Sequence, residues 1–377
     1  MSTIPSSPAS AVSGSAPAPP PDMVEDCMGI VQLLSDGTVR RSLDYSHLPM
    51  LRHVPSDLPV QWKDVVYDTG NGLRLRMYRP TTAGRAEKKH PKLPVLVYFH
   101  GGGFCIGSFE WPNFHAGALR LAGELPALVL SADYRLAPEH RLPAAHRDAE
   151  TVLSWLRDQA AAGTDAWLAE CADFGRVFVC GDSAGGNMVH HVAARLGSGA
   201  LALGDRVRVV GCVILWPYFG GVERTAAEAE AEAMAPSSEF DPGKNFDQMW
   251  RLALPDGATR DHPAANPFGP ESAPLDDVRF PPVLVANVGV NHVRQEVEEG
   301  RCGEEVAPTA KAGRDRMRDR VAEYVARLRA MGKPVELAEF EGQGQGFFVF
   351  APFGDASDEL VRVVRQFMCT CTATSHG

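Results

Sequence analysis

Short apolar segments alternate with longer amphipathic ones over most of this chain. Six apolar runs of five to nine residues are bounded by turn residues, and hydrophobic residues recur at helical spacing between them. Continuous apolar runs of this length are typical of strands that are buried on both faces of a sheet. Alternating strands and helices pack as a mostly parallel sheet with helices on both faces. We therefore predict the α/β class, with strands at residues 94–99, 127–131, 176–180, 207–215, 281–286 and 334–340.

The segments between these strands have the periodicity of amphipathic helices. Helices are expected at residues 113–124, 144–162, 184–196, 316–331 and 358–368. Ahead of the first strand, the stretch VVYDTGNGLRLRMYRP contains two alternating runs that meet at Asn71 and Gly72, which is typical of a β-hairpin. We place this hairpin at the antiparallel edge of the sheet. The stretch MVEDCMGIVQLL, residues 23–34, is expected to form a short amphipathic helix.

The chain has 377 residues, and the alternating pattern favours one large domain at residues 23–368. Residues 1–22 are rich in Ser, Ala and Pro and are predicted to form a disordered tail, and residues 369–377 a C-terminal tail. Two stretches interrupt the pattern. Residues 218–274 are too long for a plain connection and suit a helical cap, and residues 287–311 read as an atypical insertion.

Charge and composition exclude several classes of partner. The net charge of −10 and the absence of Lys and Arg clusters argue against a nucleic-acid surface. No apolar run reaches the roughly 18 residues that span a bilayer, and the first residues lack the pattern of a secretory signal. The eight cysteines are scattered without zinc-like pairing, which indicates a reducing compartment. We expect a cytoplasmic protein, with the nucleus as a further location, that binds a small hydrophobic ester or carboxylic acid.

The stretch VFVCGDSAGGNMVHHVAARL carries the strongest chemical signal. A predicted strand runs into Gly181, Asp182, Ser183, Ala184 and Gly185, and a predicted helix follows. This is the G-x-S-x-G pattern of a nucleophile elbow, in which a sharp turn exposes the serine hydroxyl. A Cβ at either outer glycine would clash in so tight a turn. The N–H of Ala184 at the helix start points toward a developing oxyanion.

A second glycine-rich stretch, VYFHGGGFCIGS, also follows a predicted strand. Gly101 to Gly103 allow the backbone to approach a ligand closely and supply N–H groups for an oxyanion hole. Such a donor typically contributes ~2.7–4 kcal/mol to lowering the barrier. His100 precedes the loop and is expected to orient it by hydrogen bonding rather than to act as a base.

Three segments together carry a family resemblance: HGGGF, DYRLAPEHRLPAA and GDSAGGN. At these spacings the chain resembles the hormone-sensitive-lipase-like branch of the α/β-hydrolases, in particular the plant carboxylesterases, which include the gibberellin receptor as a non-catalytic relative. The resemblance spans residues 23–368. It implies an α/β-hydrolase fold with a helical cap, a Ser, Asp, His triad in that chain order, hydrolysis of small carboxylic esters, no metal and no organic cofactor.

Under this resemblance, Ser183 matches the nucleophile, and Ala184 with Gly101 to Gly103 matches the oxyanion hole. The stretch AGRDRMRDRVAEY matches the segment that bears the acid, at Asp315. Asp319 is the second candidate for the acid, although its spacing suits the following helix and a surface ion pair.

Asp182, next to the nucleophile, is expected to support the site by hydrogen bonding. The usual final segment G-x-x-H-G-F stands here as GQGQGFF, so Gln345 occupies the position of the base. A serine hydroxyl attacks poorly unless a base takes its proton, and an amide cannot do so. By analogy with serine proteases, ~10³–10⁴-fold catalysis over water remains when a triad member is lost.

Other histidines are poor replacements for the missing base. His190 and His191 follow Ser183 on the elbow helix and are expected to point away from its hydroxyl. His262 lies in the predicted cap and suits a structural role. His292 lies within the insertion and reaches the site only if that segment folds back. His376 follows Asp315 but belongs to the polar C-terminal tail.

The insertion separates a strand from the acid. Joining Ala286 directly to Ala312 would give PPVLVAAGRDRMRDR, a strand that runs straight into the turn of Asp315, as in the family. Residues 287–311 are therefore either an extra surface loop or a translated retained intron. Each doubling of loop length costs only about 0.6 kcal/mol, so Asp315 can keep its place.

Three functions stay open at this point. The first is a weakly active esterase for small hydrophobic esters, in which Ser183 is acylated and water deacylates it. The second is a receptor or carrier for a hormone-like carboxylic acid on the same fold, with residues 23–45 as a lid. The third is a damaged gene product, favoured by the insertion and the lost base together.

Overall fold

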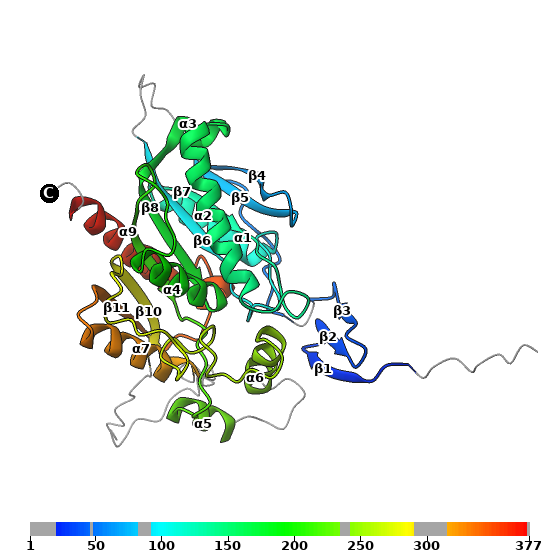
Figure 1. Cartoon of the computed structure of the whole chain (residues 1–377). Coiled ribbons are helices and arrows are strands. Elements are labelled where there is room, and N and C mark those ends of the chain that lie inside the picture. The colour runs from blue at the N-terminus through cyan, green and yellow to red at the C-terminus, as the bar shows by residue number, and fades with distance from the viewer. Residues whose placement is uncertain (1–19, 46–47, 82–91, 234–241, 290–314, 375–377) are drawn as a thin grey trace, which may run out of the picture.

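The computed structural model of the chain describes residues 20–45, 48–81, 92–233, 242–289 and 315–374. An eight-stranded sheet forms its centre, with the strand order β11-β10-β9-β8-β6-β7-β5-β4 (Figure 1). Only β5 runs against the other strands, so the sheet is mostly parallel. Its strands are β4 (Val60–Asp68), β5 (Leu73–Pro80), β6 (Leu93–Phe99), β7 (Leu128–Ala132), β8 (Ala172–Asp182), β9 (Val209–Leu215), β10 (Val283–Gly289) and β11 (Val335–Glu341).

Helices cover both faces of this sheet and bury a separate apolar cluster on each. One cluster includes side chains of α2 (Ala144–Ala162), α3 (Ala166–Cys171), α4 (Ala184–Gly197) and α7 (Arg318–Ala330). The opposite cluster includes side chains of α1 (Pro112–Glu124), α8 (Phe347–Phe350) and α9 (Asp355–Thr374). Two further helices, α5 (Ala226–Ala233) and α6 (Pro242–Ala253), form the predicted cap beyond one end of the sheet (Figure 1).

The predicted α/β class and its main elements are confirmed. Each of the six predicted strands and five predicted helices matches an observed element, and the hairpin at Asn71 and Gly72 forms the β4 edge. The predicted C-terminal tail is wrong at its start, because α9 continues to Thr374. Cys371 is buried in this extension, where it continues the apolar stripe of the helix.

The helix predicted over residues 23–34 is wrong. This stretch forms β1 (Met23–Cys27) and β2 (Val31–Leu34), which pair with β3 (Val39–Arg41) in an antiparallel sheet of three strands. Met28 and Gly29 both adopt positive φ, at 59° and 64°, and this turn reverses the chain where a helix would continue. In this arrangement Cys27, Ile30, Val31 and Leu34 are buried, whereas Met23 and Val24 are exposed.

This N-terminal sheet is tied to loops that border the site. The guanidinium of Arg41 donates to the carbonyls of Cys105 and Ala137, both at 2.7 Å, and pairs with Glu139. Glu25 pairs with Arg251 on α6. The sheet therefore connects the glycine loop to the cap.

The predicted start of the insertion is also wrong. Strand β10 continues through residues 287–289, which pair with residues 339–341 of β11. Asn287 is buried, and its side-chain amide donates to the carbonyl of Arg318 at 3.3 Å, so it belongs to the folded domain. Residues 290–311 of the predicted insertion, and most of the predicted N-terminal tail, lie outside the described residues.

Candidate active site

The turn between β8 and α4 has the strained geometry of an elbow. Ser183 adopts φ 52° and ψ −112°, a conformation that non-glycine residues rarely take. A Cβ on Gly181 would lie 2.4 Å from the carbonyl oxygen of Gly185, and one on Gly185 would lie 2.0 Å from the carbonyl oxygen of Phe99. Both glycines are therefore required, because no side chain fits between these backbones.

Hydrogen bonds hold the strained residue from two sides. The N–H of Ser183 donates to the carbonyl of Leu215 at 2.9 Å, and the carbonyl of Ser183 accepts from the N–H of Tyr218 at 2.8 Å. Leu215 is the last residue of the neighbouring strand β9, and Tyr218 lies in the segment that follows it. The position of Ser183 is thus fixed by the sheet itself, and its side chain stays partly exposed.

The glycine loop follows β6 and lies beside the elbow. Gly102 and Gly103 adopt φ 118° and 59°. Within the described ranges, the N–H groups of Gly102, Gly103 and Ala184 have no hydrogen-bond acceptor. Gly101 corrects the sequence prediction, because its N–H donates to a carboxylate oxygen of Asp182 at 3.0 Å and is not free for a ligand.

Asp182 connects the elbow to the glycine loop. Besides Gly101, its Oδ1 atom accepts from the hydroxyl of Tyr98 at 2.5 Å. Burial raises the pKa of Asp182 to about 6, while these two donors act to lower it. A Cβ on Gly101 would lie 2.4 Å from the other carboxylate oxygen of Asp182. Asp182 therefore links strand β6, the glycine loop and the elbow through hydrogen bonds.

His100 lies inside the glycine loop with its ring fully buried. Nδ1 lies 2.7 Å from the carbonyl oxygen of Gly101; since a carbonyl only accepts, Nδ1 is the donor. The ring stacks on Tyr134 with 4.4 Å between centroids. Burial lowers the pKa of His100 to about 4, so the ring is neutral near pH 7. These contacts orient the loop and leave His100 unsuited to deprotonate Ser183.

Asp315 is buried directly before α7. Its Oδ1 atom accepts from the N–H of Met317 at 2.9 Å, whereas Oδ2 has no hydrogen-bond partner among the described residues. Burial raises the pKa of Asp315 to about 6. Asp319, the second candidate for the acid, is engaged elsewhere: its side chain accepts from the N–H of Ala227 on α5 and pairs with Arg318.

Gln345 lies in the loop between β11 and α8. Its side chain is partly exposed and forms no hydrogen bond to the residues that the structure describes. Phe347, two residues later, packs its ring against Trp216 and Phe340, with ring centroids 4.9 and 5.2 Å apart. This packing anchors the loop. The glycine loop, the elbow and the Gln345 loop follow the carboxyl ends of parallel strands, where α/β proteins bind ligands.

Three histidines that were considered as replacements for the base make contacts elsewhere in the described structure. Nδ1 of His190 lies 2.9 Å from the hydroxyl of Tyr324, and burial lowers the pKa of His190. His191 packs on His146 with 3.7 Å between ring centroids. Nδ1 of His262 accepts a hydrogen bond from the N–H of Ala264. His292 and His376 lie outside the described residues.

Two residues that border the site were not identified from sequence. Asp133 accepts from Ser108 Oγ at 3.0 Å and from the N–H of Phe109 at 2.8 Å, so it anchors the far end of the glycine loop. Its place in DYRLAPEHR, just after a strand, was a usable signal. Met249 of α6 lies against Gly103, where a Cβ would come within 2.1 Å of its sulfur atom. No local pattern marks Met249, because the contact joins residues far apart in sequence.

Over the described part of the chain, no group of three or more His, Cys, Asp and Glu side chains is arranged to hold a metal ion. Among the same residues, no helix combines the length and apolar character needed to cross a bilayer.

Comparison with known proteins agrees with this geometry. A family model described as alpha/beta hydrolase fold matches residues 96–300. The chain is 39% identical over 247 residues to probable carboxylesterase 6 of Arabidopsis thaliana, covering 65% of this chain and 69% of the relative. It is 34% identical over 313 residues to the gibberellin receptor GID1C of the same plant, covering 80% and 79%.

A solved structure gives the same result. The esterase of Pyrobaculum calidifontis superimposes with a TM-score of 0.61 at 26% identity, covering 84% of this chain and 85% of that one. The fold, the elbow and these relatives lead to one family. The chain belongs to the α/β-hydrolases, in the carboxylesterase-like branch that it shares with the gibberellin receptor.

Proposed function

We propose that the protein is a carboxylesterase-type serine hydrolase of low turnover for small hydrophobic esters. The observation that carries this proposal is the elbow: Ser183 stands beside three N–H groups, of Gly102, Gly103 and Ala184, that have no acceptor among the described residues. In an ester hydrolase such groups stabilise the negative charge that develops on the carbonyl oxygen. No step in this reaction calls on a cofactor.

The reaction would have two stages. The hydroxyl oxygen of Ser183 attacks the ester carbonyl, and the resulting oxyanion accepts hydrogen bonds from the three N–H groups. The alcohol then leaves with a proton, and the acyl-serine remains. Water then attacks the acyl group and releases the acid and free Ser183. Both stages need a group that takes a proton and returns it. Gln345 cannot supply this, so turnover is limited by the missing base.

Binding without turnover is the second candidate, and Gln345 itself favours it. A relative of this chain bears the name of a hormone receptor, gibberellin receptor GID1C. The N-terminal sheet adds a structural reason, because Arg41 and Glu25 hold it against the glycine loop and α6 as a lid would be held. In this case the ligand would be a hydrophobic carboxylic acid, whose carboxylate suits the free N–H groups.

Hydrolysis of p-nitrophenyl acetate and butyrate separates these functions. The purified protein is compared with Gln345→His and with Ser183→Ala. We expect a feeble parent, an increase in kcat of about 100-fold or more for Gln345→His, and loss of the activity in Ser183→Ala, because a positioned general base contributes 10²–10⁴-fold. A fast parent that Gln345→His leaves unchanged would show that another base acts. A parent and Gln345→His variant that both fail to hydrolyse esters would favour the binding function.

A further inference from the structure

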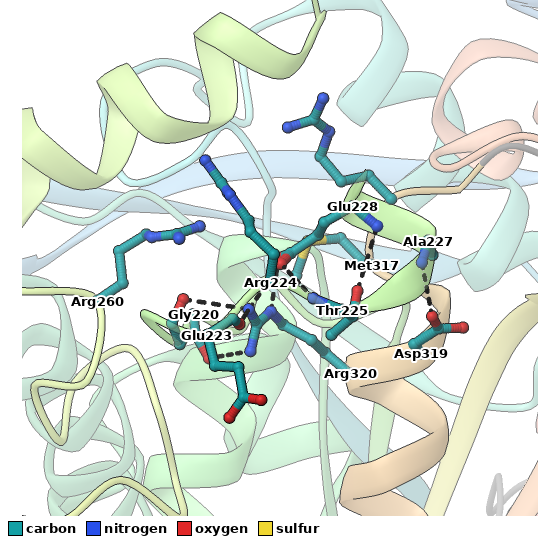
Figure 2. A network of polar contacts seen from close by, with 12 residues as sticks. Gly220, Glu223, Arg224, Thr225, Ala227, Glu228, Arg260, Met317, Asp319 and Arg320 are labelled. Atoms are coloured by element: carbon teal, nitrogen blue, oxygen red, sulfur yellow. Dashed lines mark hydrogen bonds and ion pairs between the residues drawn. The ribbon is translucent and has the colours of Figure 1, made fainter. Parts of the chain in front are cut away.

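A buried ion pair joins the cap to the helix that follows Asp315. Arg320 lies on α7 and Glu228 on the cap helix α5 (Figure 2). Nε and Nη2 of Arg320 donate to the two carboxylate oxygens of Glu228 at 2.6 and 2.7 Å. The two residues are only 9% and 3% exposed. Breaking such a pair leaves a buried charge without its partner, which is strongly destabilising.

The same guanidinium also binds the backbone that leads into α5. Nη1 donates to the carbonyl of Gly220 at 3.1 Å, and Nη2 also donates to the carbonyls of Gly221 and Glu223 at 3.1 and 2.7 Å. Figure 2 shows Gly220 and Glu223 beside Arg320. A Cβ on Gly221 would lie 2.1 Å from the guanidinium, so the chain passes directly over it. Arg320 therefore fixes the backbone from Gly220 to Glu223, just before α5.

Glu228 also caps its own helix. Its carboxylate accepts from the N–H of Thr225 at 3.0 Å, and the N–H of Glu228 donates to the hydroxyl of Thr225 at 3.2 Å, which is the reciprocal pattern of a capping box. Asp319 contributes a second bond across the same contact, since it accepts from the N–H of Ala227 at 2.7 Å (Figure 2). The start of α5 and the start of α7 are thus one hydrogen-bonded unit.

Asp315 is tied both to the sheet and to this unit. The 25 residues 290–314 separate the end of β10 from Asp315 along the chain. Met317 and Val321, which follow Asp315, are buried in the apolar cluster on the same face of the sheet. Asn287 of β10 still binds the carbonyl of Arg318 at 3.3 Å, but this is one bond to an uncharged group. The charged contacts of the turn are those with α5.

We propose that Arg320 and Glu228 are positioning residues that hold Asp315 in place, so that the cap contributes to where the acid lies. This inference rests on the proposed function, in which Asp315 is the acid of the triad. It also implies that cap and acid are coupled: a ligand that displaces α5 displaces the turn of Asp315 as well.

The test uses a titratable reporter at the position of the base. In the Gln345→His variant, the pKa of the introduced imidazole is measured by NMR titration. A nearby carboxylate raises an imidazole pKa, so the value should fall by about one unit or more when Asp315→Asn is added. Adding Glu228→Gln instead should lower it by a similar amount, because Asp315 leaves its place. Adding Glu323→Gln, which breaks an exposed pair with Arg327 on the same helix, should leave it unchanged.

Two results would overturn the proposal. One is an imidazole pKa that Glu228→Gln leaves at the Gln345→His value while Asp315→Asn lowers it. The other is a value that Asp315→Asn itself does not change. If Glu228→Gln does not fold, Arg320→Lys makes the same comparison, because it keeps the charge and loses the fork of donors. The titration does not depend on ester hydrolysis, so failure of the proposed function and failure of this inference give different results.

Discussion

The two sides of the candidate site differ in how tightly they are packed and in how fully their carboxylates are hydrogen-bonded. On the side of Ser183, backbones approach so closely that Gly181 and Gly185 admit no Cβ, and Asp182 binds two donors. On the opposite side, a Cβ on Gly344 would meet nothing within 4 Å, and Asp315 has an oxygen without a partner among the described residues. The nucleophile side is part of the sheet and must be kept for the fold. The base position is not needed by the fold, so its residue could change.

The largest expected effect comes from replacing one glycine on each side with alanine and comparing the loss of stability. Gly185→Ala places a methyl group against the carbonyl of Phe99, so we expect destabilisation by more than about 4 kcal/mol, or no folded protein. Gly344→Ala should change stability by less than about 0.5 kcal/mol. Urea denaturation monitored by circular dichroism measures both. Equal effects of the two substitutions would contradict the comparison.

Removing the hydroxyl of Tyr98 should lower the stability on the nucleophile side by less than Gly185→Ala does. Tyr98→Phe deletes a donor to the buried carboxylate of Asp182, a bond to a charged group, with an expected cost of about 1.5–3 kcal/mol at about pH 8. Since the pKa of Asp182 is raised to about 6, the carboxyl is protonated at about pH 5, and the cost there should fall to about 1 kcal/mol.

Tyr134→Phe is the matched control for this hydroxyl. It removes a bond to the neutral carbonyl of His100, so its cost should be about 1 kcal/mol at either pH. A cost for Tyr98→Phe that is equally independent of pH would mean that Asp182 is not ionised at about pH 8.

The acid side should respond with the opposite sign. Burial raises the pKa of Asp315 above that of the unfolded chain, so the folded state retains a proton that the unfolded state loses as the pH rises from about 4 to about 6. Stability therefore falls over this window, and the ionised carboxylate is a cost above it. We expect Asp315→Asn to stabilise the protein by about 1–2 kcal/mol at about pH 8 and to have little effect at about pH 4.

Chemical denaturation of Asp315→Asn at the two pH values measures this gain. A loss of stability at about pH 8 would show that the carboxylate has a favourable partner. In that case the acid side would be as well satisfied as the nucleophile side, and the comparison between the two would fail.

Most of the fold was readable from local patterns. The six strands and five helices are each specified by a run of apolar residues with one periodicity, and the elbow by glycines on either side of Ser183. These signals are local because each element buries its own apolar side against the same sheet. The predicted helix at residues 23–34 failed because its apolar spacing fits equally well two strands with a turn at Met28 and Gly29.

The site contacts that could not be predicted from the sequence join residues that are far apart along the chain. The predicted oxyanion donor Gly101 is engaged by Asp182, 81 residues later, and this contact exists only after β6 and β8 have paired. Met249 and the Arg320–Glu228 pair join the cap to distant elements in the same way. Such contacts depend on how elements pack, which no short motif records.

The unequal halves of the site also bear on how this gene can change. Codons for glutamine and histidine share their first two bases, so a single third-position substitution exchanges Gln345 for His. The elbow glycines, in contrast, are required by the fold itself, since a Cβ at Gly181 or Gly185 would clash with backbone atoms. Under the proposed function, the fold would thus preserve a nearly complete hydrolase that lies one base substitution from a histidine at position 345.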